Sequence, residues 1–370
     1  MKVGITGKNG FVGYHLSNHV IQNKDLKLVD FERTFFQNNN LLDSFVSNCD
    51  IIVHLAAVNR HKEEDYIFDT NISLAKKLSD SIRRVKFDKK LVYVSSIHEK
   101  SETAYGLSKL KSKEIFLNLS KEENFDFTSL TVPNIFGPFC RPNYNSFIST
   151  FSYLLINNKE PELKDNKSIK LIYIDNLILE ITKEFYNTDS KFMRAIEEDI
   201  EIKVDKVLEK LSHYQTLYIK NDVIPDISNS FDLNLFNTFR SYIDYKNFYP
   251  RTLKNNQDER GNFSEIIRTN SLGQFSFSTT NKGFIRGNHF HSRKVERFCV
   301  TSGKALICIR KIGTDEKLEF ILDGETPSFI DMPIWYTHSI QNIGETPLTT
   351  LFWINEPYNP NDTDTFFENV

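Results

Sequence analysis

Residues 91–96 read Leu91-Val-Tyr-Val-Ser-Ser96, and Tyr105-Gly-Leu-Ser-Lys109 follows a short distance along the chain. The apolar, β-branched run predicts a buried parallel strand that carries a hydroxyl at its carboxyl end. If a helix begins near Tyr105, then Tyr105 and Lys109 lie on one face, because they are four residues apart. A nearby Lys and a bound nicotinamide ribose would lower the pKa of the Tyr105 phenol until it exchanges a proton with a carbonyl oxygen that Ser96 holds. The alternative is a core strand followed by an ordinary surface helix.

The N-terminal segment predicts a turn that binds a dinucleotide. Lys2-Val-Gly-Ile-Thr6 is expected to be the first strand, and Gly7-Lys-Asn-Gly10-Phe-Val-Gly13 follows it. Glycines let the backbone approach a pyrophosphate, and the N-terminus of the next helix supplies N–H donors and a favourable dipole. The G-x-x-G-x-x-G spacing differs from the commonest dinucleotide fingerprint. We nevertheless expect cofactor contacts at Gly7, Gly10, Phe11, Val12 and Gly13.

Charged residues after the second expected strand, Leu26 to Phe31, bear on the choice of cofactor. An acid such as Asp30 or Glu32 would bind the ribose 2′-OH of NAD, whereas Arg33 would pair with the 2′-phosphate of NADP. We favour NADP through Arg33. The alternative is that all three charges are solvated loop residues.

A third buried strand, Asp50-Ile-Ile-Val-His-Leu-Ala-Ala57, ends in small residues. Leu55, Ala56 and Ala57 would let the cofactor lie close to the sheet. A helical pattern through Asn71–Val85 then precedes the strand that ends at Ser96. This β-α-β alternation predicts an α/β fold with a parallel, doubly wound sheet.

A later strand and loop offer residues for a substrate. Ser129-Leu-Thr-Val-Pro-Asn134 precedes Arg141-Pro-Asn-Tyr-Asn145. Asn134, Arg141 and Asn145, beyond the carboxyl end of a strand, suit a sugar and its phosphates. An ordinary loop rich in Pro and Asn is the alternative.

From about residue 247 short alternating strands with Gly, Pro and Asn turns predict an all-β domain. It contains Gly283-Phe-Ile-Arg-Gly-Asn-His289-Phe-His291-Ser-Arg-Lys-Val-Glu296, and His338 comes much later. Alternate residues of a strand point the same way, so His289 and His291 share a face. With Glu296 and His338 they form a credible set of ligands for a divalent metal, Zn²⁺ by preference.

The composition excludes several classes of protein. The 370 residues suggest two or three domains, and a net charge of −3 with mixed signs gives no reason to expect a nucleic-acid partner. We expect no signal peptide and no membrane span, and therefore a cytoplasmic protein. The four cysteines lie far apart and without Cys-x-x-Cys pairing, which is typical of reduced thiols: Cys49, Cys140, Cys299 and Cys308.

The first two thirds of the chain resembles the extended short-chain dehydrogenase/reductase family. The matching segments are Thr6-Gly7-Lys-Asn-Gly10-Phe-Val-Gly13, His54-Leu-Ala-Ala57, Val94-Ser-Ser96, Tyr105-Gly-Leu-Ser-Lys109 and Tyr173-Ile-Asp175. The resemblance implies a Rossmann fold, with Tyr105 as proton donor, Lys109 as its ribose-bound helper and Ser96 as the group that holds the carbonyl. Ser95 is the alternative to Ser96.

The last third resembles the cupins, small jelly-roll barrels. The first cupin motif, G-x5-H-x-H-x4-E-x6-G, fits Gly283 through Gly303. The second fits Pro333 to Asn342 less well, because Trp335 stands where cupins usually have Gly. We therefore expect domains at 1–246 and 247–370.

A reductase joined to a cupin resembles the bifunctional enzymes of capsular-polysaccharide synthesis. This resemblance implies C3 epimerisation of a UDP-linked 4-keto-6-deoxy-N-acetylhexosamine by the cupin and then NADPH-dependent reduction of its C4 ketone. The product would be UDP-2-acetamido-2,6-dideoxy-L-talose, a precursor of UDP-N-acetyl-L-fucosamine. His289 would be both a metal ligand and the candidate base, with Tyr336 as proton donor and Lys294 as enolate stabiliser. We also expect a homodimer.

Two other functions compete with this one. The first is a single-step reductase whose cupin serves only dimerisation and stability. The second is a non-enzymatic NADP-binding regulator, against which the intact Ser96, Tyr105 and Lys109 argue, since a sensor needs no proton pathway.

Overall fold

The structure is a computed structural model, and it describes residues 1–188, 192–253, 255–258, 261–264, 266–267, 273–356 and 359–370. The packing of the chain separates it into two compact units. The first comprises Met1–Thr150 and Leu163–Lys206, and the second comprises Phe151–Glu162 and Val207–Val370. No helix among the described residues is long and apolar enough to span a bilayer.

A six-stranded parallel sheet forms the centre of the first unit, with strand order β2-β1-β3-β4-β5-β8. The α/β prediction with a doubly wound Rossmann sheet is therefore confirmed. The carboxyl ends of parallel strands meet at one edge, where ligands bind in folds of this type. The strands are β1 (Lys2–Thr6), β2 (Lys27–Val29), β3 (Ile51–His54), β4 (Lys90–Ser96), β5 (Asp126–Val132) and β8 (Phe192–Ala195).

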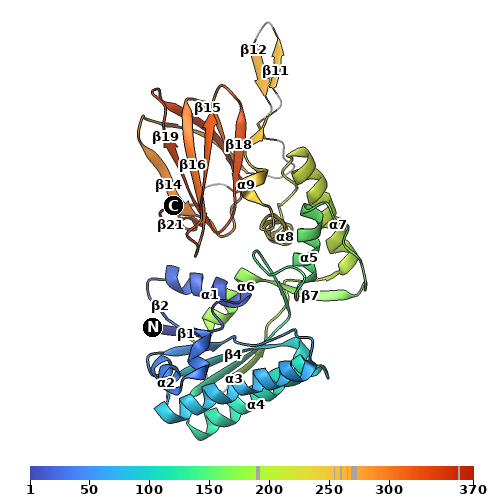
Figure 1. The fold of residues 1–370 in the computed structure, drawn as a ribbon, viewed down its shortest axis with the longest axis vertical. Coiled ribbons are helices and arrows are strands. Elements are labelled where there is room, and N and C mark those ends of the chain that lie inside the picture. Colours follow the sequence, from blue (N-terminus) through green and yellow to red (C-terminus); the bar gives the residue numbers. More distant parts are fainter. Residues whose placement is uncertain (189–191, 254, 259–260, 265, 268–272, 357–358) are drawn as a thin grey trace. The chain divides into compact units, whose positions relative to one another are not determined.

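Helices cover both faces of this sheet (Figure 1). Helices α1 and α6 contact each other on one face, and α2, α3 and α4 pack side by side on the other. A small sheet of β6, β7 and β9 completes the unit. The bounds are α1 (Phe11–Gln22), η1 (Arg33–Gln37), α2 (Asn39–Ser47), α3 (Glu64–Val85), η2 (Ile97–Lys100), α4 (Ala104–Glu122), β6 (Asn134–Phe136), β7 (Ser168–Tyr173), α6 (Ile174–Lys183) and β9 (Ile200–Lys203).

Strand β4 lies in the hydrophobic core of the first unit. All seven residues of β4 are buried, as a strand with helices on both faces requires. Each fully buried aromatic side chain contributes about 1.5–3 kcal/mol of hydrophobic stabilisation. The aromatic residues of this core are Phe31, Phe36, Phe45, Phe87, Tyr93, Phe116, Phe125 and Phe127.

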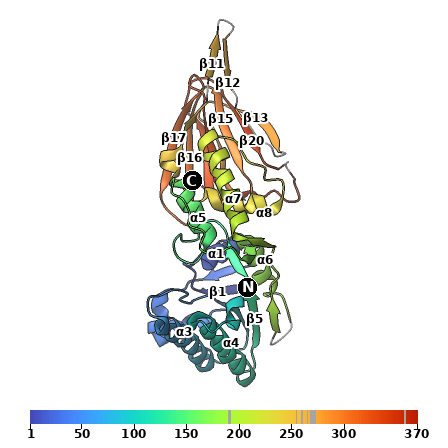
Figure 2. The ribbon, with the colours of Figure 1, turned by 90° about the vertical axis from the view of Figure 1, so that its right-hand side faces the viewer.

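Two five-stranded sheets form the barrel of the second unit, with orders β10-β18-β15-β20-β13 and β17-β16-β19-β14-β21 (Figure 2). The all-β prediction for the C-terminal part is thus confirmed. A separate two-stranded hairpin, β11 and β12, lies between β10 and β13 in the chain. The bounds are β10 (Arg251–Thr252), β11 (Asn255–Asp258), β12 (Gly261–Ser264), β13 (Gln274–Thr280), β14 (Ile285–Phe290), β15 (Glu296–Ser302), β16 (Lys304–Lys311), β17 (Lys317–Asp323), β18 (Ser328–Met332), β19 (Tyr336–Asn342), β20 (Leu348–Ile354) and β21 (Phe366–Phe367).

Helical segments belong to the second unit together with the barrel. Arg240 donates to the carbonyl of Met332 at 3.1 Å, and Asn237 donates to the carbonyl of Arg293 at 3.2 Å. The two compact units therefore differ from the domains expected from the sequence, which were separated by one boundary near residue 247. The bounds are α5 (Phe147–Ile156), α7 (Val204–Tyr214), η3 (Gln215–Lys220), α8 (Ser230–Arg240) and α9 (Tyr245–Phe248), and divisions between the units fall within both α5 and α7.

A buried ionic network joins these helical segments to the barrel. Arg297 donates to both carboxylate oxygens of Asp331, at 2.7 and 3.0 Å, and to the carbonyl of Asp222 at 3.0 Å. The hydroxyl of Tyr218 also donates to Asp331, which is 0% exposed, and lies 2.6 Å from that of Tyr249. Burial by itself would raise the pKa of Asp331, but the charge and hydrogen bonds of Arg297 outweigh this effect. The pKa of Asp331 is therefore lower than its usual value, and the carboxylate is ionised.

We predict that Arg297→Met destabilises the second unit by about 3–5 kcal/mol, because it leaves the Asp331 charge buried without its partner. Urea unfolding followed by tryptophan fluorescence measures this unit specifically, since the two tryptophans of the chain, Trp335 and Trp353, both lie in it. Lys282→Met, which removes an exposed pair with Glu345, is the control and should cost less than about 1 kcal/mol. Equal losses in the two variants would contradict the prediction.

Candidate functional site

The glycine turn after β1 brings the expected cofactor residues together. Gly7 has φ +79°, and a Cβ there would lie 2.9 Å from the amide nitrogen of Ala56. A Cβ on Gly13 would lie 2.2 Å from the carbonyl of Gly7. The turn is therefore packed between the start of α1 and the segment after β3, and a larger side chain at either position would separate them.

The first turn of α1 has the properties of an anion site. Its residues are all described; none of them is acidic, and no side chain caps the helix at Gly10. The amide of Gly10 donates to the carbonyl of Gly7 at 2.9 Å, which closes the turn. The N–H groups of Phe11 and Val12 begin the helix and are suitable donors to a pyrophosphate.

The charged residues near the end of β2 differ in their contacts. The carboxylate of Asp30 forms an ion pair with Lys8 of the glycine turn, and this contact lowers the pKa of Asp30. Arg33 is exposed at the first residue of η1. The end of β2 is thus followed by the acids Asp30 and Glu32 and by the cation Arg33, so it offers partners for a ribose 2′-OH and for a 2′-phosphate.

Ser95 and Ser96 have different environments at the end of β4. Ser95 Oγ donates to Glu99 at 2.5 Å, and Glu99 is itself paired with Lys113 at 2.6 Å. Ser96 Oγ accepts from the amide of His98 at 3.2 Å, so its own proton is available for a ligand. This geometry favours Ser96 over Ser95 as the residue that holds a carbonyl oxygen.

The start of α4 lies directly against the turn that follows Ser96. A Cβ on Gly106 would lie 2.1 Å from the carbonyl of His98, so this approach requires glycine. The hydroxyl of Thr103 caps the helix by accepting from the amide of Gly106 at 3.1 Å. As a result Tyr105, in the first turn of α4, lies close to the end of β4.

Lys109 lies one turn further along α4 and is almost completely buried, with 5% of its surface exposed. Its amine donates to the carbonyl of Val94 at 2.5 Å and lies 4.5 Å from the centre of the Tyr93 ring. Burial lowers the pKa of Lys109 to about 7, although Glu99 opposes the shift. The amine can therefore exchange a proton near neutral pH.

The phenol of Tyr105 is desolvated in the protein without cofactor. Burial raises its pKa to about 12, with a further contribution from Tyr144, whereas the lowered pKa expected from the sequence refers to the state with a bound nicotinamide ribose. Desolvation opposes formation of the phenolate. The phenol is therefore protonated at neutral pH, which is the form that donates a proton to a carbonyl oxygen.

The expected substrate residues are only partly brought together. Arg141 is exposed, and its guanidinium lies 5.4 Å from the centre of the Tyr144 ring, next to Tyr105. Asn145 is exposed in the same loop, whereas Asn134 donates to the carbonyl of Lys170 within the small sheet.

The sequence analysis did not identify two residues of this region. Arg60 donates to the carbonyl of Tyr144 at 2.5 Å and thereby holds that loop. Asn71 exchanges two hydrogen bonds with the backbone of Val58, at 2.7 and 2.9 Å, and donates to Ser108 of α4 at 2.9 Å. An Asn inside an expected helix gave no pattern from which this role could be predicted.

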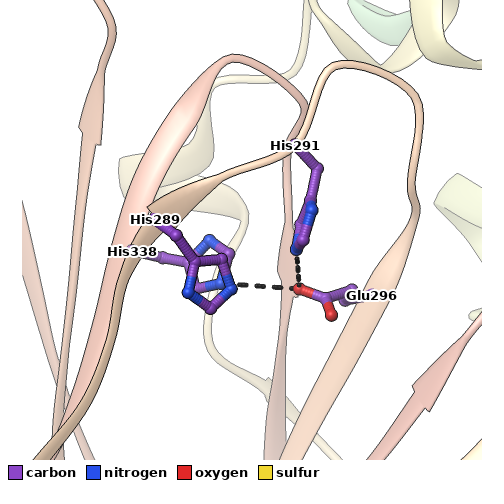
Figure 3. A group of neighbouring side chains, drawn as sticks. All are labelled: His289, His291, Glu296 and His338. Carbon is purple, nitrogen blue, oxygen red and sulfur yellow. Dashed lines mark ion pairs between the residues drawn. The ribbon is translucent and has the colours of Figure 1, made fainter. Parts of the chain in front are cut away.

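The barrel brings four expected metal ligands together. His289 of β14 and His338 of β19 are directly opposite each other in the ladder, His291 follows β14, and Glu296 begins β15 in the other sheet. One ligand atom from each lies within 4.8 Å of the others. Figure 3 shows the side chains pointing toward one another, with Nε2 of His291 and of His338 at 3.1 and 3.4 Å from Glu296 Oε2.

The chemistry of this cluster fits a divalent cation. Within the described structure no hydrogen bond satisfies the buried His338 Nε2, and the buried His291 Nε2 and Glu296 Oε2 face each other at 3.1 Å. Although burial raises the pKa of Glu296, the imidazoles hold it at about 2, and burial lowers the pKa of His338 to about 3. His291 differs, because Glu296 raises its pKa against the effect of burial. A cation would replace the proton that this imidazole otherwise shares with Glu296.

Three other residues of the cupin motif have clear positions. Tyr336 lies two residues before His338 on β19, and its ring centre is 5.6 Å from that of Tyr245. The Lys294 amine donates to the carbonyl of Thr363 at 2.5 Å. Trp335 has φ +60°, so it adopts the left-handed conformation for which the family uses Gly, at a cost of about 1–3 kcal/mol.

Known families and structures match both parts of the chain. Residues 3–177 match the NAD dependent epimerase/dehydratase family, and residues 256–366 match the polysaccharide biosynthesis C-terminal domain. The chain is 30% identical to the UDP-2-acetamido-2,6-beta-L-arabino-hexul-4-ose reductase of Pseudomonas aeruginosa, over 99% of this chain and 98% of the reductase. The capsular polysaccharide assembling protein CapF from Staphylococcus aureus is 30% identical with a TM-score of 0.64, and all of both chains is covered.

A third likeness concerns the fold alone. RMD from Pseudomonas aeruginosa, whose structure is complexed with NADPH, has a TM-score of 0.53 at 14% identity and covers 58% of this chain and 84% of its own.

The fold and the family matches define a protein of the NAD-dependent epimerase/dehydratase type that carries a C-terminal domain of polysaccharide biosynthesis. The identity with the Pseudomonas aeruginosa reductase and with CapF extends over both units. The chain belongs to the CapF family of polysaccharide-synthesis proteins, and the resemblance stated from its sequence is confirmed.

We predict that the purified chain binds about one divalent cation, because four ligands complete one site. A cation bound only by the folded barrel stabilises it, so EDTA should lower the Tm that tryptophan fluorescence reports. Glu296→Gln should remove both the cation and this effect, while Glu319→Gln, on the exposed strand β17, should retain them. Metal analysis that finds no cation in well-folded protein would overturn the assignment.

Proposed function

We propose that the chain is a bifunctional enzyme of sugar-nucleotide metabolism. Its cupin epimerises C3 of a UDP-4-keto-6-deoxy-N-acetylhexosamine, and its Rossmann unit then reduces the C4 ketone with NADPH. The product is UDP-2-acetamido-2,6-dideoxy-L-talose, which leads to UDP-N-acetyl-L-fucosamine. The observation that carries the proposal is the buried Lys109, four residues after Tyr105 on α4, in a chain whose relative over its whole length is a reductase of a UDP-linked hexul-4-ose.

In the reduction, Tyr105 donates its proton to the C4 oxygen as the carbonyl becomes an alcohol. The raised pKa of Tyr105 keeps that proton in place until the oxygen gains charge, and Lys109 supplies the nearby positive charge that stabilises the phenolate. Ser96 donates a hydrogen bond to the same oxygen. NADPH bound at the glycine turn supplies the hydride.

In the epimerisation, the C4 ketone makes the proton on C3 acidic. A base removes this proton to give an enolate, and reprotonation from the other face inverts C3. His289 is the candidate base, and burial together with His291 lowers its pKa, so the imidazole is neutral at pH 7. Tyr336, on the same strand face as His338, is the candidate proton donor. His289, His291, Glu296 and His338 would hold the cation, proposed to be Zn²⁺, whose role would be mainly structural.

The decisive experiment separates the two reactions in the full chain. We predict that Tyr105→Phe lowers NADPH oxidation by about 10²–10⁴-fold, because the general acid is lost, while NADPH binding is retained. In D₂O without NADPH, the same variant should still exchange deuterium into C3 of the ketosugar. Mass spectrometry of the sugar and absorbance at the NADPH band measure the two outcomes. Tyr66→Phe, at an exposed position of α3, is the control and should behave as the wild type.

The His289→Asn variant distinguishes the two roles assigned to this residue. Loss of the cation would make His289 a ligand, whereas a retained cation with loss of C3 exchange would make it the base. Near-normal NADPH oxidation by Tyr105→Phe would remove that tyrosine from the mechanism.

A prediction for the cofactor follows from the charges after β2. Arg33→Gln should raise the KM for NADPH about tenfold, as expected for one lost hydrogen bond to a charged group, and leave the KM for NADH nearly unchanged. Lys27→Gln, at the opposite end of β2, is the matched control. Steady-state kinetics with both cofactors measures the effect. A wild type that prefers NADH would refute the assignment of NADPH.

A second function is a single-step reductase with a structural cupin. It is favoured by one observation, that the metal cluster joins the two sheets of the barrel and so has a structural reason to exist. This function predicts no C3 exchange in the absence of NADPH.

A further inference from the structure

Asp364, near the C-terminus, is buried against the loop that connects two of the proposed metal ligands. It is 4% exposed and has φ +43°. The next residues form β21, which pairs with β14 so that Phe367 is opposite His289. The end of the chain therefore packs against the metal cluster, although it lies far from the cupin motifs in the sequence.

The carboxylate of Asp364 holds the loop between His291 and Glu296. Its Oδ1 accepts from the amide of Ser292 at 3.1 Å and from the hydroxyl of Ser292 at 2.6 Å. Its Oδ2 accepts from the amides of Arg293 and Lys294, each at 3.1 Å. Three consecutive backbone N–H groups thus converge on one buried carboxylate, so the shape of this loop depends on the negative charge.

The backbone of Asp364 contacts a ligand directly. His291 Nδ1 donates to the carbonyl of Asp364 at 2.5 Å. A proton on Nδ1 leaves Nε2 as the nitrogen with the free lone pair, and Nε2 is the atom that faces Glu296. The same residue thereby sets both the tautomer of His291 and the path of the chain to Glu296.

We propose that Asp364 is a positioning residue for the divalent-metal site, so that the C-terminal segment clamps the ligand loop and sets the affinity of the site. The inference rests on the metal site of the proposed function. Partners that orient a ligating His typically contribute a factor of about 10–100 to metal affinity. No cupin motif contains Asp364, so the role could not be assigned from those motifs.

The neighbouring Asp362 provides a matched control. It is also an acid of the C-terminal segment, but its side chain is 60% exposed, and its ion pair is with the side chain of Arg293 at 2.8 Å. Within the described structure its carboxylate accepts no hydrogen bond from the backbone of the ligand loop. Asp362→Ala therefore removes a carboxylate two residues away without removing the clamp.

The experiment measures Zn²⁺ affinity in the full chain by competition with a chromogenic chelator, at a temperature where tryptophan fluorescence shows each variant folded. We expect Asp364→Ala to weaken Zn²⁺ binding about 10–100-fold, and Asp362→Ala to bind as the wild type does. Substitution with Co²⁺ gives a spectroscopic test, because altered orientation of His291 changes the visible absorption bands. A change in global stability alone would leave these bands unmoved.

A second variant covers the case in which Asp364→Ala does not fold. Ser292→Ala removes only the 2.6 Å hydrogen bond to Oδ1 and should weaken Zn²⁺ binding about fivefold, the value of one ordinary hydrogen bond. A wild type that binds Zn²⁺ and variants with unchanged affinity and Co²⁺ spectrum would overturn the role of Asp364 alone. A wild type that binds no Zn²⁺ would instead refute the proposed metal site.

Discussion

The burial of ionic groups is the constraint on which both units depend. An ion taken out of water costs several kcal/mol unless other groups surround it with compensating charge or hydrogen bonds. Lys109 meets this demand through the carbonyl of Val94 and the ring of Tyr93, and Asp331 through Arg297 and Tyr218. The helices and strands around each group must keep their positions, because any displacement would leave a charge uncompensated. Precise placement of these side chains is therefore a consequence of their burial.

The same constraint explains what the sequence could and could not predict. Parallel strands covered by helices are continuous apolar runs, so β4 and the glycine turn were predicted from local patterns. Three of the four candidate metal ligands were predicted from a motif with fixed spacing, and His338 was predicted from a second motif that fits less well. Desolvation depends on the packing of the whole unit, and for that reason the raised pKa of Tyr105 in the protein without cofactor could not be predicted from a local pattern. The contacts of Arg60, Asn71 and Asp364 join segments far apart in the chain, and no local pattern contains them.

The proposed pair of reactions has an order that the chemistry of the sugar itself imposes. The C4 ketone is the electron sink for removal of the C3 proton, and reduction destroys that ketone. Epimerisation must therefore come first, and an alcohol formed too early could not return to the cupin as a substrate. The protonated state of Tyr105 and the partly buried, neutral His289 suit these two steps at the same pH. Neither site requires conditions that would disable the other.

The order of the two units along the chain affects folding during synthesis. The chain enters the second unit at Phe151–Glu162, returns to the first unit at Leu163, and enters the second unit again at Val207. The segment Leu163–Lys206, which completes the first unit, emerges only after a piece that belongs to the second. Leu155, which is buried in the finished protein, belongs to the second unit, most of which is synthesised only after Lys206. A nascent chain halted at Lys206 would expose this side chain to other nascent chains and to chaperones. Expression of residues 1–206 without the barrel should accordingly favour aggregation over a soluble domain.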